Sequence, residues 1–143
     1  MVRPAPGLTL SEQPEGVLKR CVLWGEARGE DNFTKLCILH VIANRVRKHG
    51  STWTAEILKP WAFSSFNHDD PNSAKLLIGY QLEPASWAAC DAVAELFPMT
   101  TDPTNGAMNY YALSMNPGPK WGRGHADWQE RLVTGGMAFG ICP

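Results

Sequence analysis

The segment from Phe33 to Lys48 is apolar around much of its helical circumference, which limits how the chain can fold. Asn32 is suited to cap the first turn of this helix, and Gly50 follows the last turn as a stop signal. A helix with apolar side chains on most sides has to be surrounded by other elements. We therefore predict a central helix, whose apolar positions are Phe33, Leu36, Cys37, Leu39, Val41, Ile42 and Val46.

A second predicted helix precedes it and ends beside a carboxylate. Ser11 or Gln13 is suited to cap it, Pro14 fits its first turn, and Gly29 follows its end near residue 27. Glu26 lies at the flank of the apolar stripe, where we expect a half-buried side chain that reaches a cleft. Desolvation there raises a carboxyl pKa and favours a proton donor. The alternative is an ordinary surface glutamate. The stripe consists of Val17, Leu18, Cys21, Val22 and Gly25.

The rest of the chain predicts shorter elements and little β structure, so we expect a mainly α (α+β) fold. A Pro-rich arm, residues 1–10, precedes one domain, residues 11–143. Helical stretches are predicted over 53–58, from Asp70-Pro71 to Ile78, and after Glu83-Pro84, where Trp87, Cys90, Ala94 and Phe97 form a stripe. Loops are predicted over 61–70 and 98–106, an extended piece over 107–112, and a short helix near Trp121 and Trp128 before a closing strand, 137–141.

Charge and composition exclude several classes of partner. The net charge is −1 and Lys and Arg form only short clusters, Lys19-Arg20 and Arg45, Arg47, Lys48, which we interpret as solvated helix faces. We therefore expect no nucleic-acid partner, and the monomer is the expected state. No signal peptide or membrane span is recognised, which predicts synthesis in the cytosol and another route of release to the cell wall.

The four cysteines form no C-x-x-C pair, and three of them occupy helical patterns. We interpret those three as buried small hydrophobes, and disulfides stay an open alternative.

Metal and nucleophile chemistry find little support in the sequence. His40, His49, His68 and His125 form no H-E-x-x-H motif and no close pair, and no G-x-S-x-G is present. His68 with Asp69 and Asp70 is able to hold a metal but also suits a turn and a helix cap. We predict no metal and no cofactor.

Glycosidases need two carboxylates about 5 to 9.5 Å apart, so a reaction of this kind requires a partner for Glu26. The candidates are Glu30, Asp31, Asp69 and Asp70. Glu30 and Asp31 follow Gly29, where water keeps them ionised and where their charge favours the start of the next helix. None is a compelling nucleophile, which favours a reaction that uses a single acid.

Four segments resemble the spore-cortex-lytic-enzyme (SleB-like) family of bacterial and phage cell wall hydrolases. Trp24-Gly25-Glu26-Ala27-Arg28-Gly29-Glu30 is similar to that family's opening motif, and His40-Val41-Ile42-Ala43-Asn44-Arg45-Val46 to its "V-x-N-R-V" helix. Trp61-Ala62-Phe63-Ser64 resembles its P-x-Q-F-S loop, and Gly106-Ala107-Met108-Asn109-Tyr110-Tyr111 its G-A-T-H-Y-Y segment. Ala62 and Asn109 depart from the usual glutamine and histidine, and residues 135–140 match the closing motif only loosely.

The resemblance implies a lysozyme-like fold with a substrate cleft, and cleavage of peptidoglycan between N-acetylmuramic acid and N-acetylglucosamine by a lytic transglycosylase. It implies Glu26 as the catalytic acid and a phage endolysin type of protein with holin-type release. A hydrolytic muramidase with a second carboxylate, and an inactive peptidoglycan-binding or structural protein, are the alternatives. The expected substrate-binding residues are Phe63, Ser64, Asn109, Tyr110, Tyr111 and Trp121.

Overall fold

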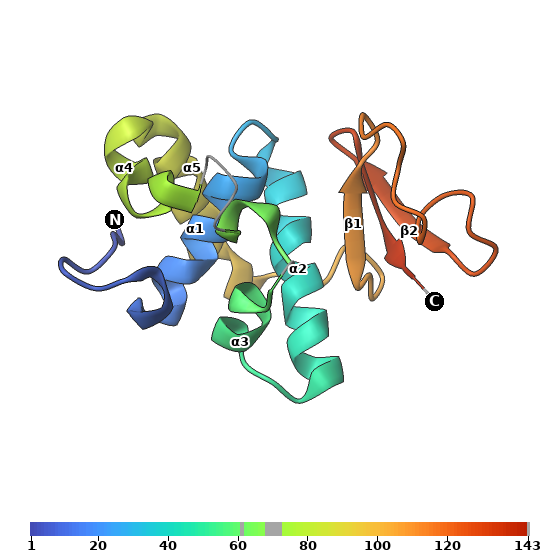
Figure 1. Ribbon diagram of the computed structural model, residues 1–143, viewed down its shortest axis with the longest axis horizontal. Coiled ribbons are helices and arrows are strands. Elements are labelled where there is room, and N and C mark those ends of the chain that lie inside the picture. Colours follow the sequence, from blue (N-terminus) through green and yellow to red (C-terminus); the bar gives the residue numbers. More distant parts are fainter. Residues whose placement is uncertain (61, 68–72, 143) are drawn as a thin grey trace.

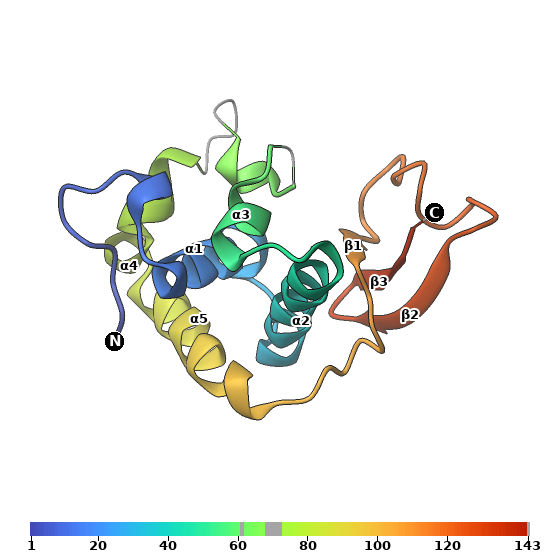
Figure 2. The same ribbon diagram turned by 90° about the horizontal axis from the view of Figure 1, so that it is seen from below.

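The centre of the fold is α2, Asn32–His49, which lies between the other helices and a small sheet (Figures 1 and 2). The structure, a computed structural model, describes residues 1–60, 62–67 and 73–142. The prediction of a central helix is confirmed, because Leu39, Val41 and Ile42 are fully buried, but Phe33 of the predicted apolar positions is 47% exposed. Because α2 is buried on several sides, it packs against both the other helices and the sheet.

The start of α2 differs by one residue from the prediction. Asp31, rather than Asn32, is the N-cap, and its carboxylate accepts a hydrogen bond of 2.7 Å from the Thr34 amide. A carboxylate at this place also complements the positive end of the helix dipole. Gly50 ends the helix in the left-handed conformation, with φ of +59°, as predicted.

Helix α1 spans Glu15–Ala27, which confirms its end but corrects its beginning. Leu10–Glu12 form a separate 3-10 turn, η1. Gln13 does not cap α1, because its side chain binds the arm instead: Nε2 donates to the Ala5 and Leu8 carbonyls, and Oε1 accepts from the Ala5 amide. The side chain that was expected to start the helix therefore holds the N-terminal arm against it.

The other helices are α3, Trp53–Leu58, α4, Gly79–Leu82, and α5, Pro84–Leu96. The predictions for α3 and α5 are confirmed, and Trp87 and Cys90 of the predicted stripe are fully buried. Short 3-10 turns cover η2, Ser64–Phe66, η3, Ser73–Ile78, and η4, Phe97–Met99. The predicted start of a helix at Asp70-Pro71 lies outside the described residues. The guanidinium of Arg20 ties α1 to α5 through Asp91 at 2.7 Å and Glu95 at 2.8 Å.

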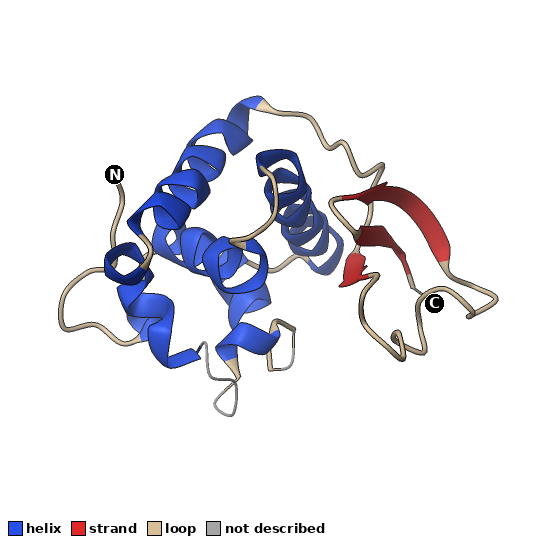
Figure 3. Ribbon diagram, turned by 90° about the horizontal axis from the view of Figure 1, so that it is seen from above, coloured by secondary structure: helices blue, strands red, loops and turns tan. Residues whose placement is uncertain are grey.

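Three antiparallel strands lie on one side of the helices, in the order β1-β3-β2 (Figure 3). They are β1, Asn109–Ala112, β2, Gln129–Thr134, and β3, Met137–Ile141. The extended piece and the closing strand are confirmed. The short helix expected near Trp121 and Trp128 is wrong, because Trp121 lies in a turn and Trp128 directly precedes β2.

These elements confirm a mainly helical α+β domain. All four cysteines are free, and Cys21, Cys37 and Cys90 are buried, as expected from their helical patterns. Within the described ranges, no helix has both the length and the apolar character needed to cross a membrane.

Candidate functional site

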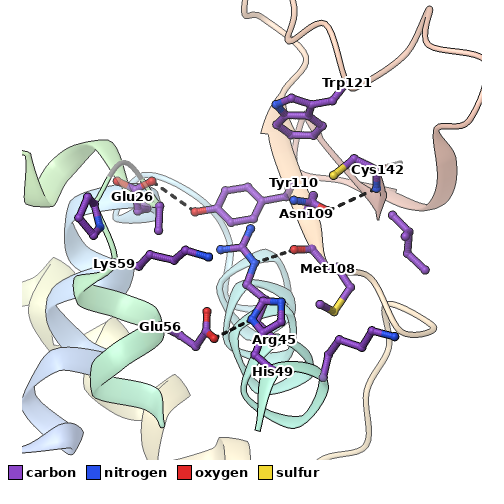
Figure 4. Close-up of a pocket in the computed structure, with 14 residues that line it drawn as sticks. Glu26, Arg45, His49, Glu56, Lys59, Met108, Asn109, Tyr110, Trp121 and Cys142 are labelled. Atoms are coloured by element: carbon purple, nitrogen blue, oxygen red, sulfur yellow. Dashed lines mark hydrogen bonds and ion pairs between the residues drawn. The ribbon is translucent and has the colours of Figure 1, made fainter. Parts of the chain in front are cut away.

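A cleft of about 620 Å³ runs between the helices and the sheet (Figure 4). Its walls come from four parts of the chain: the end of α1, the second half of α2, the α3 region, and the sheet with its loops. The residues that line it are Glu26, Arg45, Lys48, His49, Glu56, Lys59, Pro60, Ala62, Met108, Asn109, Tyr110, Trp121, Ile141 and Cys142.

Glu26 occupies the last turn of α1 and lies half-buried at one end of this cleft. Each carboxyl oxygen accepts one hydrogen bond: Oε2 from the Ser65 amide at 3.1 Å, and Oε1 from the Tyr110 hydroxyl at 3.3 Å. Burial and the nearby Glu26 raise the pKa of Tyr110 well above its ordinary value, so its hydroxyl remains a donor. The two contacts fix the position of the carboxyl group relative to the cleft.

Gly25 allows the 3-10 turn η2 to approach Glu26 so closely. A Cβ atom on Gly25 would lie 2.5 Å from Ser65 Oγ and 2.7 Å from Ser65 Cβ, too close for either atom. Ser65 is buried, and its hydroxyl finds no hydrogen-bond partner within the described part of the chain. The glycine before the glutamate therefore allows the Ser65 amide to reach the Glu26 carboxyl.

Three of the predicted substrate-binding residues line the cleft: Asn109, Tyr110 and Trp121. The Tyr110 ring stacks on Phe139 of the neighbouring strand, with centroids 5.6 Å apart, and this packing holds the hydroxyl toward Glu26. Asn109 Oδ1 accepts a hydrogen bond from the Cys142 amide at 3.3 Å. Asn109 therefore stabilises the end of β3 as well as lining the cleft.

The other three predicted residues do not line it. Phe63 is 2% exposed and belongs to the core, while Ser64 is exposed on η2 outside the lining. Tyr111 points to the opposite side from Tyr110, because side chains alternate along a strand. Its ring packs against Trp121 and Trp128 at centroid distances of 5.6 and 5.7 Å. Tyr111 thus packs against the cleft residue Trp121 without lining the cleft itself.

Arg45 belongs to the candidate site, although its position in a short cluster of basic residues predicted a solvated helix face. Its guanidinium instead lies in the cleft, where Nε donates to the Met108 carbonyl at 2.7 Å. The same group lies 5.5 Å from the centroid of Phe63. Burial lowers the pKa of Arg45 from its ordinary value, and Tyr110 and Glu56 oppose that shift. The available signal was its place in the Asn44-Arg45-Val46 part of the segment that resembles the family's V-x-N-R-V helix.

Glu56 is a second carboxylate of the cleft, and no pattern in the sequence indicated it. It is 5% exposed and accepts hydrogen bonds from His49 Nδ1 at 2.7 Å and Ser51 Oγ at 2.6 Å. Burial alone would raise the pKa of Glu56, but these hydrogen bonds outweigh it and hold the pKa below its ordinary value. Glu56 is therefore an ionised carboxylate of low basicity, with both of these hydrogen bonds on its Oε1 atom.

The carboxylates proposed as partners from sequence lie elsewhere or outside the described residues. Asp31 caps α2, and Glu30 lies beside the turn at Gly135, where a Cβ would come within 2.8 Å of its Oε2. Asp69 and Asp70 are not among the described residues. In the described ranges, no group of three or more His, Cys, Asp or Glu side chains is arranged to hold a metal ion.

Comparison of the chain with protein-family models, with curated proteins and with solved structures finds no match. The function of the cleft therefore has to be argued from its own residues.

Proposed function

We propose that this protein cleaves the glycan strand of peptidoglycan between N-acetylmuramic acid and N-acetylglucosamine, as a lytic transglycosylase. The observation that carries the proposal is the Glu26 carboxyl, held by the Ser65 amide and the Tyr110 hydroxyl at one end of an extended cleft. The resemblance of four sequence segments to cell wall hydrolases supports the same choice of residue. An indole at Trp121 in the cleft suits stacking against a sugar ring.

In the proposed reaction Glu26 acts first as an acid. Its proton passes to the glycosidic oxygen while the bond between that oxygen and C1 of the muramoyl ring breaks. The N-acetylglucosamine portion leaves with a free hydroxyl. The carbonyl oxygen of the muramoyl acetamido group stabilises the positive charge that develops at C1.

Glu26 then acts as a base. Its carboxylate takes the proton from the C6 hydroxyl of the muramoyl residue, and the C6 oxygen bonds to C1 to close a 1,6-anhydro ring. No water is consumed and Glu26 ends protonated, as it began. The Ser65 amide and the Tyr110 hydroxyl hold the carboxyl group in place through both steps.

A hydrolytic muramidase is the second candidate, and Glu56 is the observation that favours it. An inverting enzyme needs a second carboxylate to activate water. Glu56 lines the same cleft, but the hydrogen bonds that it accepts from His49 and Ser51 lower its pKa, which makes it a weak base toward water. We therefore favour the reaction with one carboxylate.

The test is the Glu26→Gln variant, which keeps the size of the side chain and removes its acid function. We expect a melting temperature close to that of the wild-type protein and loss of soluble product from purified peptidoglycan. Near-full activity of this variant would rule out Glu26 as the acid.

Mass spectrometry of the wild-type products distinguishes the reactions. Anhydro-muramoyl ends, lighter than hydrolysed ends by one water molecule, support the transglycosylase, and hydrolysed ends support the muramidase with Glu56. Binding of peptidoglycan without any soluble product from the wild-type protein would instead favour a binding or structural role.

A further inference from the structure

Two cationic side chains, Arg45 and Lys59, converge in the cleft, and no carboxylate of the described residues forms an ion pair with either. The Arg45 guanidinium and the Lys59 ammonium point toward one another just below the contact between Glu26 and Tyr110 (Figure 4). Apart from the Nε contact to Met108, the guanidinium makes no hydrogen bond or ion pair with the described residues, and Lys59 makes none with them either. Like charges that face each other repel unless an anion is bound between them.

The two acidic residues described in the cleft, Glu26 and Glu56, pair with neither cation. Glu56 attracts both Arg45 and Lys59 at longer range, but the hydrogen bonds that its carboxylate accepts, both at Oε1, come from His49 and Ser51 and not from either cation. The Glu26 carboxyl is held by the Ser65 amide and the Tyr110 hydroxyl and forms no ion pair with either cation. Lys48 adds a further cation to the lining. Among the described lining residues, three cations, Arg45, Lys48 and Lys59, therefore stand against two carboxyl groups, Glu26 and Glu56.

We propose that Arg45 and Lys59 bind a carboxylate carried by the muramoyl residue next to the bond that is cleaved. The proposal rests on the proposed function, because it places this residue beside Glu26. Muramic acid differs from N-acetylglucosamine by a lactyl ether arm that ends in a carboxyl group. A guanidinium with its terminal NH₂ groups available binds a carboxylate through paired hydrogen bonds, and a lysine adds a mobile point charge.

Two different parts of the glycan strand are able to supply the carboxylate. In a strand without peptides the lactyl arm itself ends in a carboxylate. In a strand with peptides that group is an amide, and the carboxylates belong to the peptide stem. In either case the site binds muramoyl residues in preference to neutral sugars. It thereby places the muramoyl residue, and not N-acetylglucosamine, on the C1 side of the cleaved bond.

The test measures binding by the full-length Glu26→Gln protein, so that turnover does not consume the ligand. Titration calorimetry compares three glycans of equal length: one with free lactyl carboxylates, one whose lactyl groups are converted to neutral methylamides, and one with intact peptide stems. We expect the free acid, the peptide-bearing form, or both to bind at least about tenfold more tightly than the methylamide. Tight binding of the free acid alone assigns the lactyl carboxylate, and tight binding of the peptide-bearing form assigns the stem.

Lys59→Gln and Arg45→Gln, each in the Glu26→Gln protein, should reduce this preference to less than about threefold. Lys59 is exposed, so its replacement leaves the fold intact even if that of Arg45 does not. Lys75→Gln is the matched control, since Lys75 is an exposed lysine of η3 outside the cleft, and it should keep the full preference.

Equal binding of the charged and neutral glycans, or a preference that survives both replacements, would overturn the anion site. The wild-type protein could release no product while the Glu26→Gln protein still prefers the charged glycans and loses that preference on replacement of Arg45 or Lys59. That result would support the anion site and overturn the proposed reaction. Absence of binding to all three glycans would overturn both.

Discussion

Gly25 sets how closely η2 packs against α1, and its replacement by alanine tests whether that packing positions Glu26. The new Cβ would lie 2.5 Å from Ser65 Oγ, 2.7 Å from Ser65 Cβ and 2.9 Å from Leu76 Cδ2. Overpacking of this kind costs about 1–3 kcal/mol, whereas alanine gains about 1 kcal/mol over glycine inside a helix. We therefore expect a net loss of up to about 2 kcal/mol, which lowers the melting temperature by up to about 6 °C.

The loss of activity should exceed the loss of stability. Relief of the clash moves η2 away from α1 and breaks the hydrogen bond from the Ser65 amide to Glu26. A shift of about 1 Å in a catalytic group costs about 10²-fold in rate. The assays are thermal denaturation followed by circular dichroism, and the release of soluble fragments from purified peptidoglycan at a temperature where all variants are folded.

Gly16→Ala in the same helix is the matched control. A Cβ at Gly16 meets only the far end of Arg20, at an ordinary contact distance of 3.5 Å. It should keep full activity and raise the melting temperature by up to about 3 °C. The double replacement Gly25→Ala with Ser65→Gly removes the two closest atoms but keeps the amide, so it should recover activity. The reasoning is refuted if Gly25→Ala behaves like Gly16→Ala in both assays, or if the double variant is no more active than Gly25→Ala.

Three further predictions follow from other contacts. Tyr110→Phe removes one of the two hydrogen bonds to Glu26 and should reduce kcat about tenfold with little change in KM; unchanged kcat would show that the Ser65 amide alone is sufficient. Burial would raise the pKa of Asp102, but hydrogen bonds from Thr104 and other groups outweigh it and lower the pKa. Asp102 therefore adds to the free energy of unfolding above about pH 4, and this contribution is lost as the pH falls through the folded-state pKa. Urea denaturation across that pH range should therefore show a smaller loss for Asp102→Asn than for the wild type, and parallel curves would contradict this. A thiol reagent should label Cys142 in the native protein and the other three cysteines only after unfolding, because they are buried; rapid labelling of all four would contradict the packing.

Local patterns in the sequence were sufficient for the helical part of this fold. The apolar periodicity of α1, α2 and α5 reflects burial of one side or most sides of a helix, and burial acts on every turn. Strand β2 was missed because most of its side chains are exposed, so it carries no apolar alternation. Its formation depends on hydrogen bonds to β3, which is a distant partner that a local pattern does not report.

In the candidate site, too, one part was indicated by the sequence and the rest was decided by tertiary packing. The sequence indicated Glu26, because its position at the flank of an apolar helix is a local property of that helix. Tertiary packing decided the partners of Glu26: Ser65 and Tyr110 lie 39 and 84 residues further along the chain. It also turned Arg45 into the cleft and buried Glu56, although both are charged residues that a sequence pattern assigns to solvent. The physical reason is that a charged side chain is placed by the partners that surround it, and those partners come together only when the chain has folded.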